Sequence, residues 1–464
     1  MTAITAGTAA PLVSGAAGTH TGRRALRAAA SRVLLANWTG ASTVPSHTLY
    51  PHQWSWDSAF IAVGLSRLSP RRAQRELETL LGAQWADGRI PHIVFNPAVP
   101  HEAYFPSPDF WRSSTAGAAA GAPRDIETSG IVQPPVHALA ARLVHESDPK
   151  TSRRRGFLER VYPRLAAWHG YLHANRDLGG GGLASVLHPW EPGMDNSPCW
   201  DRPLERIDPA PATSFRRADL AHGDAADRPT DLDYGRYVRL ATDYRDRGYT
   251  DAGDPHGFVV EDPGFNAFLI VSEHALAAIA LTLGQDPEPH RERARALTTA
   301  LVARLWHPEA GLFLCHDLRT GTPIDEKSVT GLLPLLVPDL PGDVVEALLR
   351  TACGEHFGLG SSPTALAPSY DLRGRSFDSS RYWRGPAWFN INWAVERGLR
   401  QHGALAGADG LRHAILTSAG ASGFAEYVDP RTGRARGTTD FSWTAAVVLD
   451  LLARTEEREE GMDR

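Results

Sequence analysis

Apolar residues recur at helical spacing along most of the chain. Ser69 and Pro70 form a start signal, since a cap residue precedes a proline suited to a first helical turn. After them, Leu77, Leu80 and Leu81 fall near one face. Eleven other segments show the same spacing. We therefore predict helices over residues 22–38, 57–67, 70–86, 133–146, 155–175, 262–284, 287–306, 326–336, 342–352, 385–402, 406–421 and 441–456.

Strand-like alternation is scarce in this chain. Short candidates at 90–95, 258–261 and 312–315 are interpreted as hairpins carried by loops. Successive pairs of helices with polar motifs between them predict an all-α protein folded as an (α/α)6 barrel, in which the connections between helices form one face with a central pocket. A helical bundle or a solenoid is the alternative, although no repeat of roughly 34 or 40 residues supports a solenoid.

The two ends and one long internal stretch depart from the helical pattern. Residues 1–21 are rich in Ala, Thr and Gly and hold no Lys or Arg, which predicts a loose tail and no signal peptide. Residues 457–464 are charged and predict a second tail. The predicted barrel spans 22–456. Its segment 196–260 is rich in Asp, Arg and Pro, with one helix signal at 231–247, and is predicted to cap the pocket.

Composition excludes several classes of partner. A net charge of −5 over 464 residues and a pI near 6.4 give no sign of nucleic-acid or anionic-membrane binding. No apolar run is expected to approach the roughly 18 residues of a membrane span. Cys199, Cys315 and Cys353 are far apart, which predicts no disulfide framework and fits a cytoplasmic protein. The nineteen histidines show no metal-ligand spacing, so no metal or cofactor is expected. Homo-oligomerisation stays open.

Aromatic residues gather beside polar ones in two clusters. Tyr382–Trp393 holds three tryptophans within eleven residues, together with an arginine, a Gly-Pro break and two asparagines. Tyr50–Asp57 has the same character. A pyranose ring offers an apolar C–H face for stacking and a rim of hydroxyls for hydrogen bonds, so such clusters suit a sugar. We therefore predict a small-molecule glycoside as substrate.

The stretch His188–Pro198 carries the first candidate for acid–base chemistry. Its prolines and glycine predict a rigid loop that presents Glu191 and Asp195 next to the indole of Trp190. A carboxyl group beside an indole and away from bulk water has a raised pKa, which suits a general acid at neutral pH. The alternative is a turn in which Asp195 only accepts bonds from backbone N–H groups.

Further motifs offer polar groups for the same site. Glu426 stands among aromatic residues before a turn and is a candidate second carboxylate, or else a solvated loop residue. Asp57 either caps the helix that follows or binds vicinal hydroxyls. Gln133 precedes Pro134 and is expected at the mouth of the ring. The segment 228–237 is either a lid or an exposed helix.

In this order the motifs resemble those of glycoside hydrolase family 63, which includes processing α-glucosidases and mannosylglycerate and glucosylglycerate hydrolases. The resemblance runs from about Tyr50 to about Leu452. It rests on the runs HQWSWDSAF, RIPHIVFNP, SGIVQPPVHA, HPWEPGMDNSPCWD, RPTDLDYGRY, RYWRGPAWFNINW, FAEYVDP and TDFSWTAA.

The resemblance implies an (α/α)6 barrel with a smaller cap and hydrolysis of an α-linked sugar with inversion. Asp195 matches the family's general acid and Glu426 its general base. Inversion requires the two carboxyl groups to stand roughly 6.5–9.5 Å apart. Together, the resemblance and the clusters predict these substrate-binding residues: Tyr50, Trp54, Trp56, Asp57, Gln133, Trp190, Arg217, Tyr382, Trp383, Trp388, Asp440 and Trp443.

One departure from the family bears on the substrate. Asp440 and Phe441 stand where the glucosylglycerate hydrolases carry two glutamines, and an acid near the pocket would repel an anionic aglycone. A neutral substrate, as in an α-glucosidase or a trehalase-like enzyme, is therefore an alternative to a glycosylglycerate. Two other classes stay open: a sugar epimerase or isomerase with pocket histidines, and a non-catalytic sugar-binding protein with Asp195 or Glu426 held in the core or in an ion pair.

Overall fold

The structure is a computed structural model that describes residues 20–217, 220, 225–253 and 256–462, and it is predominantly helical, as predicted. Most of the predicted tail 1–21 lies outside the described residues. The α-helices are α1 (His20–Ala36), α2 (Ser55–Ser66), α3 (Pro70–Gly82), α4 (Pro108–Trp111), α5 (Ser113–Ala116), α6 (His137–Ser147), α7 (Pro149–Arg155), α8 (Phe157–Asn175), α9 (Asp201–Glu205), α10 (Asp231–Asp246), α11 (Pro263–Thr282), α12 (Glu288–Leu305), α13 (Gly342–Cys353), α14 (Phe389–Gln401), α15 (Leu405–Ala421) and α16 (Ser442–Met462). The 3₁₀ helices include η2 (His101–Ala103), η3 (Ala118–Ala120), η4 (Pro198–Trp200), η5 (Ala212–Ser214), η7 (Ala225–Asp227) and η8 (Val329–Leu336).

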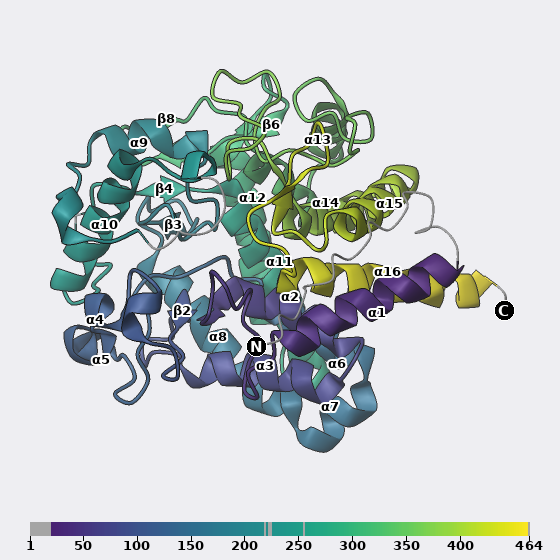
Figure 1. The fold of residues 1–464 in the computed structure, drawn as a ribbon, viewed down its shortest axis with the longest axis horizontal. Coiled ribbons are helices and arrows are strands. Elements are labelled where there is room, and N and C mark those ends of the chain that lie inside the picture. The colour runs from purple at the N-terminus through teal and green to yellow at the C-terminus, as the bar shows by residue number, and fades with distance from the viewer. Residues whose placement is uncertain (1–19, 218–219, 221–224, 254–255, 463–464) are drawn as a thin grey trace, which may run out of the picture.

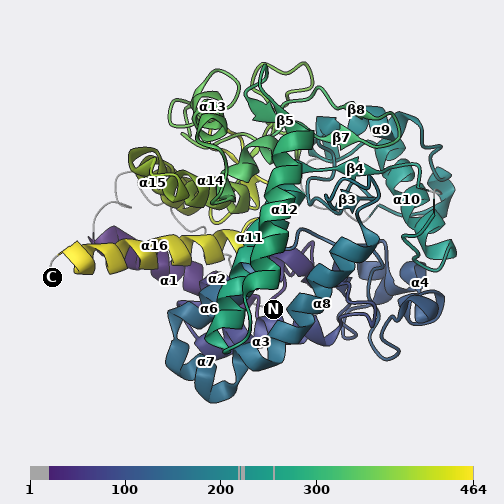
Figure 2. The ribbon, with the colours of Figure 1, turned by 180° about the vertical axis from the view of Figure 1, so that it is seen from behind.

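Six helical elements contact one another in a closed ring. In order, α2 packs on α6, α6 on α11, α11 on η8, η8 on α14, α14 on α16, and α16 back on α2. A second layer lies outside, where α1 contacts α16, α3 contacts α2, α8 and α12 contact α11, α13 contacts η8, and α15 contacts α14. Figure 1 shows α1 beside α16, and Figure 2 shows α12 crossing the outside of the ring.

Burial distinguishes the two layers. Every residue of α2 is buried, as expected for a helix enclosed by neighbours on all sides. The outer helix α3 instead buries Leu77, Leu80 and Leu81 on one face and exposes Arg71 and Arg75 on the other. The apolar spacing that predicted these helices is therefore the spacing that packs the outer layer on the inner one.

Several predicted helices differ from the structure; the one predicted over 70–86, for example, ends at Gly82. The segment predicted as helix over 326–336 forms the 3₁₀ helix η8, which contains Pro334, a residue without the N–H that an α-helical bond needs. The helix predicted over 385–402 begins only at Phe389, because Ala387–Trp388 pairs as strand β9.

The strands are two residues long and join distant loops. The hairpin predicted at 312–315 is confirmed, since β6 pairs with β5. The segments at 90–95 and 258–261 are not local hairpins: β2 pairs with β1, and β4 lies between β3 and β7. The strands are β1 (Gln53–Trp54), β2 (Ile93–Val94), β3 (Ser185–Val186), β4 (Val260–Glu261), β5 (Trp306–His307), β6 (Leu312–Phe313), β7 (His316–Asp317), β8 (Thr322–Pro323), β9 (Ala387–Trp388), β10 (Tyr427–Val428) and β11 (Ala435–Arg436).

The segment 196–260 carries α9 and α10 outside the ring. Helix α10 contacts α5, so the segment and the α4–α5 region lie on the same side of the molecule (Figure 1). At the other end, α16 continues to Met462, so residues 457–462 of the predicted tail are helical.

Helix α11 corrects one expectation about apolar runs. Residues Pro263–Thr282 are long and apolar enough to cross a membrane by length and composition, contrary to the prediction that no run approaches that length. However, 83% of its 18-residue window is buried inside the protein, because α11 contacts ring members on both sides.

Candidate active site

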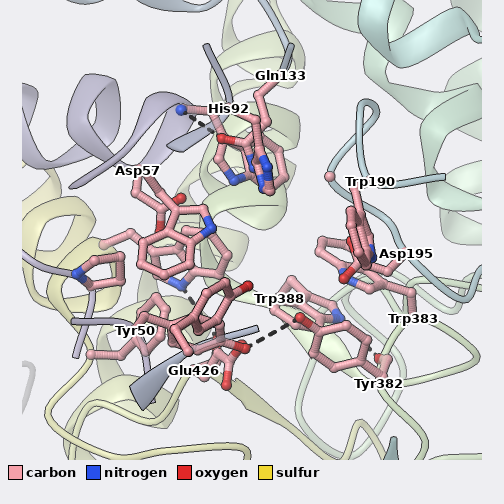
Figure 3. A pocket seen from close by; sticks show the side chains of 17 residues that line it. Tyr50, Asp57, His92, Gln133, Trp190, Asp195, Tyr382, Trp383, Trp388 and Glu426 are labelled. Atoms are coloured by element: carbon pink, nitrogen blue, oxygen red, sulfur yellow. Dashed lines mark hydrogen bonds between the residues drawn. The ribbon is translucent and has the colours of Figure 1, made fainter. Parts of the chain in front are cut away.

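A pocket opens at the ends of the ring where α2, α14 and α16 begin (Figure 3). All the predicted site residues line it except Arg217 and Asp440. Its lining consists of Pro45, Tyr50, Trp54, Trp56, Asp57, His92, Tyr104, Gln133, Trp190, Gly193, Asp195, Tyr382, Trp383, Trp388, Glu426, Phe441 and Trp443. Segments as far apart as Tyr50 and Trp443 therefore converge on one site.

Gln133 fixes the start of α2. The helix predicted over 133–146 begins only at His137 as α6, and Gln133 lies outside it, as the proline that follows Gln133 indicates. Its side-chain oxygen accepts a bond from the backbone N–H of Trp56 at 3.1 Å. That bond satisfies an N–H that the first helical turn leaves without an intrahelical partner.

Asp57 lies inside the first turn of α2 and does not act as its cap. The N-cap position belongs to Trp54, whose side chain makes no capping bond. Burial raises the pKa of Asp57 well above its ordinary value, and the nearby Glu426 raises it further. The shift favours the protonated form, which can donate a hydrogen bond to a sugar hydroxyl as well as accept one.

Stacked aromatic rings form one wall of the pocket. The rings of Trp383 and Trp388 are parallel within 3°, with centroids 3.8 Å apart, and Tyr427 stacks on Trp388 at 4.3 Å. Trp388 also donates its indole N–H to the backbone oxygen of Tyr382. The stack and this bond orient Trp383 and Trp388 along the pocket wall.

The loop that carries Asp195 is held from several sides. Tyr237 donates to the backbone oxygen of Asp195 at 2.9 Å, and the Asn196 side-chain oxygen accepts from the backbone N–H of Trp383 at 2.9 Å. Gly193 has a φ of 74° and lies so close to the Trp56 ring that a Cβ there would collide with it. The loop therefore joins the motif of Asp195 to both aromatic clusters.

The other carboxylate of this loop is structural. Glu191 is fully buried and pairs with Arg176 through two bonds of 2.8 and 2.9 Å. It also accepts from the backbone N–H of Leu187 at 2.6 Å. Glu191 does not line the pocket, so Asp195 is the loop's carboxylate there.

Glu426 and Asp195 come from different parts of the pocket wall in Figure 3, Glu426 at the bottom and Asp195 at the right. Tyr50 donates its hydroxyl to the Glu426 carboxylate at 3.0 Å, and the guanidinium of Arg228 stands 4.0 Å away. Burial raises the pKa of Glu426, while the Arg228 charge and the Tyr50 bond oppose the rise. A carboxylate with a raised pKa that is still stabilised as an anion suits a general base.

The two alternatives from other classes find little support in this geometry. His92 is the histidine that lines the pocket, and burial, reinforced by His188, lowers its pKa to about 3, far from the value that acid–base catalysis at neutral pH needs. An epimerase built on histidines is therefore disfavoured. Glu426 is buried, but it lines the pocket and its arginine stands 4.0 Å away, so it is not held in a close ion pair.

Arg217 and Asp440 are not brought to this pocket. Arg217 donates to the backbone oxygen of Pro229 at 2.7 Å and to Asp231 at 3.0 Å. Asp440 is exposed and adopts a φ of 52°, and it lines a separate groove with Ser46. Because Asp440 does not line the pocket, the predicted repulsion between Asp440 and an anionic aglycone is not supported.

Pro45, His92, Tyr104, Gly193 and Phe441 line the pocket although they were not among the predicted site residues, and Arg228, beside Glu426, was also missed. Arg228 lay in a segment interpreted as a lid or an exposed helix, yet it is only 5% exposed. Its guanidinium lies over the Tyr382 ring, 4.9 Å from the centroid, and donates to the Tyr50 hydroxyl at 3.3 Å. The one signal was its place before Thr230, whose capping box with Asp233 starts α10 just after it.

A ring of helices that opens on two carboxylates between stacked tryptophans defines a carbohydrate-active protein of the glycoside hydrolase class. Residues 50–444 match the family described as mannosylglycerate hydrolase MGH1-like glycoside hydrolase domain. The chain belongs to glycoside hydrolase family 63.

Curated relatives cover nearly the whole chain. A mannosylglycerate hydrolase from Rubrobacter radiotolerans is 42% identical over 433 residues, with 92% of this chain and 96% of the relative covered. A glucosylglycerate hydrolase from Mycolicibacterium hassiacum is 38% identical, with 92% and 97% covered. The crystal structure of a family 63 mannosylglycerate hydrolase from Thermus thermophilus, in complex with Tris and D-glycerate, superposes with a TM-score of 0.82 at 40% identity, covering 92% of this chain and 99% of that one.

Proposed function

We propose that this protein hydrolyses the α-glycosidic bond of mannosylglycerate or glucosylglycerate with inversion of the anomeric centre. In this proposal the closed ring and its outer layer form an (α/α)6 barrel, and the segment 196–260 caps its pocket. The observation that carries the proposal is the convergence of Asp195 and Glu426 on one aromatic pocket.

Each carboxyl group has one role in the single displacement. Asp195 protonates the glycosidic oxygen as the bond to the anomeric carbon breaks. Glu426 removes a proton from a water that attacks the opposite face of the sugar ring. The support for these roles is chemical: Glu426 is buried beside a cation that favours its anion, and Asp195 reaches the same pocket from a separate loop.

The remaining residues bind the glycone in this proposal. Trp383 presents a rigid ring beside the sugar, while Asp57 and Gln133 bind its hydroxyls. A glycerate aglycone is supported by charge, because Asp440 points into a different groove and Arg228 offsets the charge of Glu426. The relatives that act on mannosylglycerate and glucosylglycerate support the same substrate class.

A substrate panel tests the proposed activity. The purified protein is incubated with mannosylglycerate, glucosylglycerate, their methyl esters, trehalose and maltose, and free sugar is measured. We expect release from at least one glycosylglycerate, with a lower kcat/KM for its uncharged methyl ester. Release from trehalose or maltose alone would contradict the anionic aglycone, and release from no α-glycoside would contradict the hydrolase.

Arg228→Met is expected to move the acidic limb of the kcat/KM profile to higher pH. The Arg228 cation opposes the rise in the Glu426 pKa that burial causes. Without it that pKa rises further, so the base takes up its proton at a higher pH and the limb moves up by about one pH unit. The measurement uses a neutral aryl α-glycoside, so that Arg228 does not act through the charge of the substrate.

Two further variants control this result. Tyr50→Phe removes the 3.0 Å bond to Glu426 and should move the limb in the same direction. Arg228→Lys keeps a positive charge and should leave the limb near that of the wild type. A limb that stays in place or moves to lower pH in Arg228→Met would contradict the assignment of Glu426 as the base.

A further inference from the structure

The strand that follows the Thr432 turn packs directly on Glu426. Glu426 immediately precedes β10, which pairs with β11, and its backbone N–H donates to Thr438 O at 2.8 Å. The Thr438 N–H points back at the Glu426 carboxylate at 3.4 Å. Gly437 has a φ of 66°, and a Cβ there would collide with the same carboxylate. The position of β11 therefore fixes one side of Glu426.

The other side of Glu426 is set by the insertion. Arg228 reaches in from the segment that follows η7 and stands 4.0 Å from the carboxylate. Its guanidinium also contacts Tyr50 and Tyr382, which are side chains of the pocket wall. These contacts place the guanidinium, and on the other side of Arg228 the Pro229 backbone oxygen accepts from Arg217 at 2.7 Å.

An ion pair joins these two sides. The Asp227 carboxylate accepts from Arg436 Nη1 at 3.1 Å, and the two side chains are only 10% and 18% exposed. Asp227 directly precedes Arg228, and Arg436 directly precedes Gly437. Each partner is thus the chain neighbour of a residue that touches Glu426, although the partners are 209 residues apart.

We propose that the Asp227–Arg436 ion pair is a clasp that holds Arg228 and β11 against Glu426, and that Asp227 and Arg436 are positioning residues for the general base. The inference rests on the proposed function. Neither residue touches the substrate. Opening the clasp removes the tie between η7 and β11, and the Arg228 guanidinium then moves away from Glu426.

The clasp predicts that Arg436→Gln and Asp227→Asn behave like Arg228→Met. In each variant, the pH at which kcat/KM on the neutral aryl glycoside falls on the acidic side should increase by about one unit. At pH values below that point, this shift lowers kcat/KM about tenfold. Because the clasp acts through Arg228, adding Arg436→Gln to Arg228→Met should shift the limb little further. Arg436→Lys keeps the charge and should restore most of the wild-type profile.

Arg206→Gln is the matched control. Arg206 also ties the insertion to the rest of the protein, through bonds of 2.8 and 3.0 Å to Asp317, but neither residue lines the pocket or contacts Glu426. This variant should lose some thermal stability and keep the limb in place. An equal limb shift in Arg206→Gln would show that loosening the insertion anywhere has this effect, which overturns the clasp.

Hydrogen exchange tests the clasp without relying on turnover. Peptides that cover 225–237 should exchange faster in Arg436→Gln and Asp227→Asn than in the wild type, Arg436→Lys or Arg206→Gln. Unchanged exchange overturns the clasp even if the wild type proves inactive on every glycosylglycerate, an outcome that would separately refute the proposed function. Faster exchange with an unmoved limb also overturns it, since Arg228 would then stay in place without the ion pair.

Discussion

Glu426→Gln is expected to lower kcat on a glycosylglycerate by about 10²- to 10⁴-fold, the contribution of a positioned general base. The amide has nearly the same shape and can still accept from Tyr50, which bonds the carboxylate at 3.0 Å in the wild type. The fold should therefore survive, with an unchanged circular dichroism spectrum and a melting temperature close to that of the wild type. Glu355→Gln, at an exposed carboxylate paired with Arg373, should keep wild-type activity.

The variant Asp195→Asn distinguishes the role of the general acid from that of the general base. A general acid matters most when the leaving group needs a proton, so this variant should lose activity on a glycosylglycerate and recover much of it on a dinitrophenyl glycoside. Glu426→Gln should stay impaired on both substrates, because the attacking water still needs a base. Wild-type turnover in either variant, or the reverse pattern of recovery, would contradict the assignment.

Arg176→Met is expected to destabilise the protein by about 3–5 kcal/mol, because it leaves the buried Glu191 carboxylate without its cation and removes the nearer of two cations from Asp251. Arg176 and Glu191 are both fully buried, and Arg176 also stands 3.1 Å from the buried Asp251. The loss should appear as a lower denaturant midpoint. Activity should fall as well, since Glu191 holds the backbone of the loop that presents Asp195.

A double variant and a surface pair control this prediction. Adding Glu191→Gln to Arg176→Met removes one of the stranded charges, so the double variant should be more stable than the sum of the single changes predicts. Arg142→Met breaks an exposed pair with Glu146 and should cost at most about 1 kcal/mol. Similar denaturant midpoints for Arg176→Met and Arg142→Met would show that the buried ion pair contributes no more to the free energy of unfolding than the exposed pair does.

The helical architecture could be predicted because its cause is local. The spacing of apolar residues predicts one apolar face for each outer helix. In α3 these residues include Leu77, Leu80 and Leu81, and all three are buried. The prediction failed where a local residue overrides that spacing, as Pro334 does within η8. The family resemblance was confirmed, since the matched family covers residues 50–444.

The parts of the site that sequence reasoning missed depend on contacts between distant segments. Arg228 sits in a polar stretch, and its burial comes from Tyr50 and Tyr382, which no pattern around Arg228 reveals. Asp440 was expected at the pocket, but its left-handed backbone conformation turns it out to the solvent. The position of a charged side chain at a loop therefore required the three-dimensional structure.

An anomer-resolved proton NMR time course with mannosylglycerate and glucosylglycerate tests the central claim most directly. Single displacement by Asp195 and Glu426 predicts that the β-anomer of the sugar appears first and that the α-anomer follows only by mutarotation. Initial formation of the α-anomer would show retention and contradict the proposed pair of roles. No sugar from either substrate would contradict the activity itself.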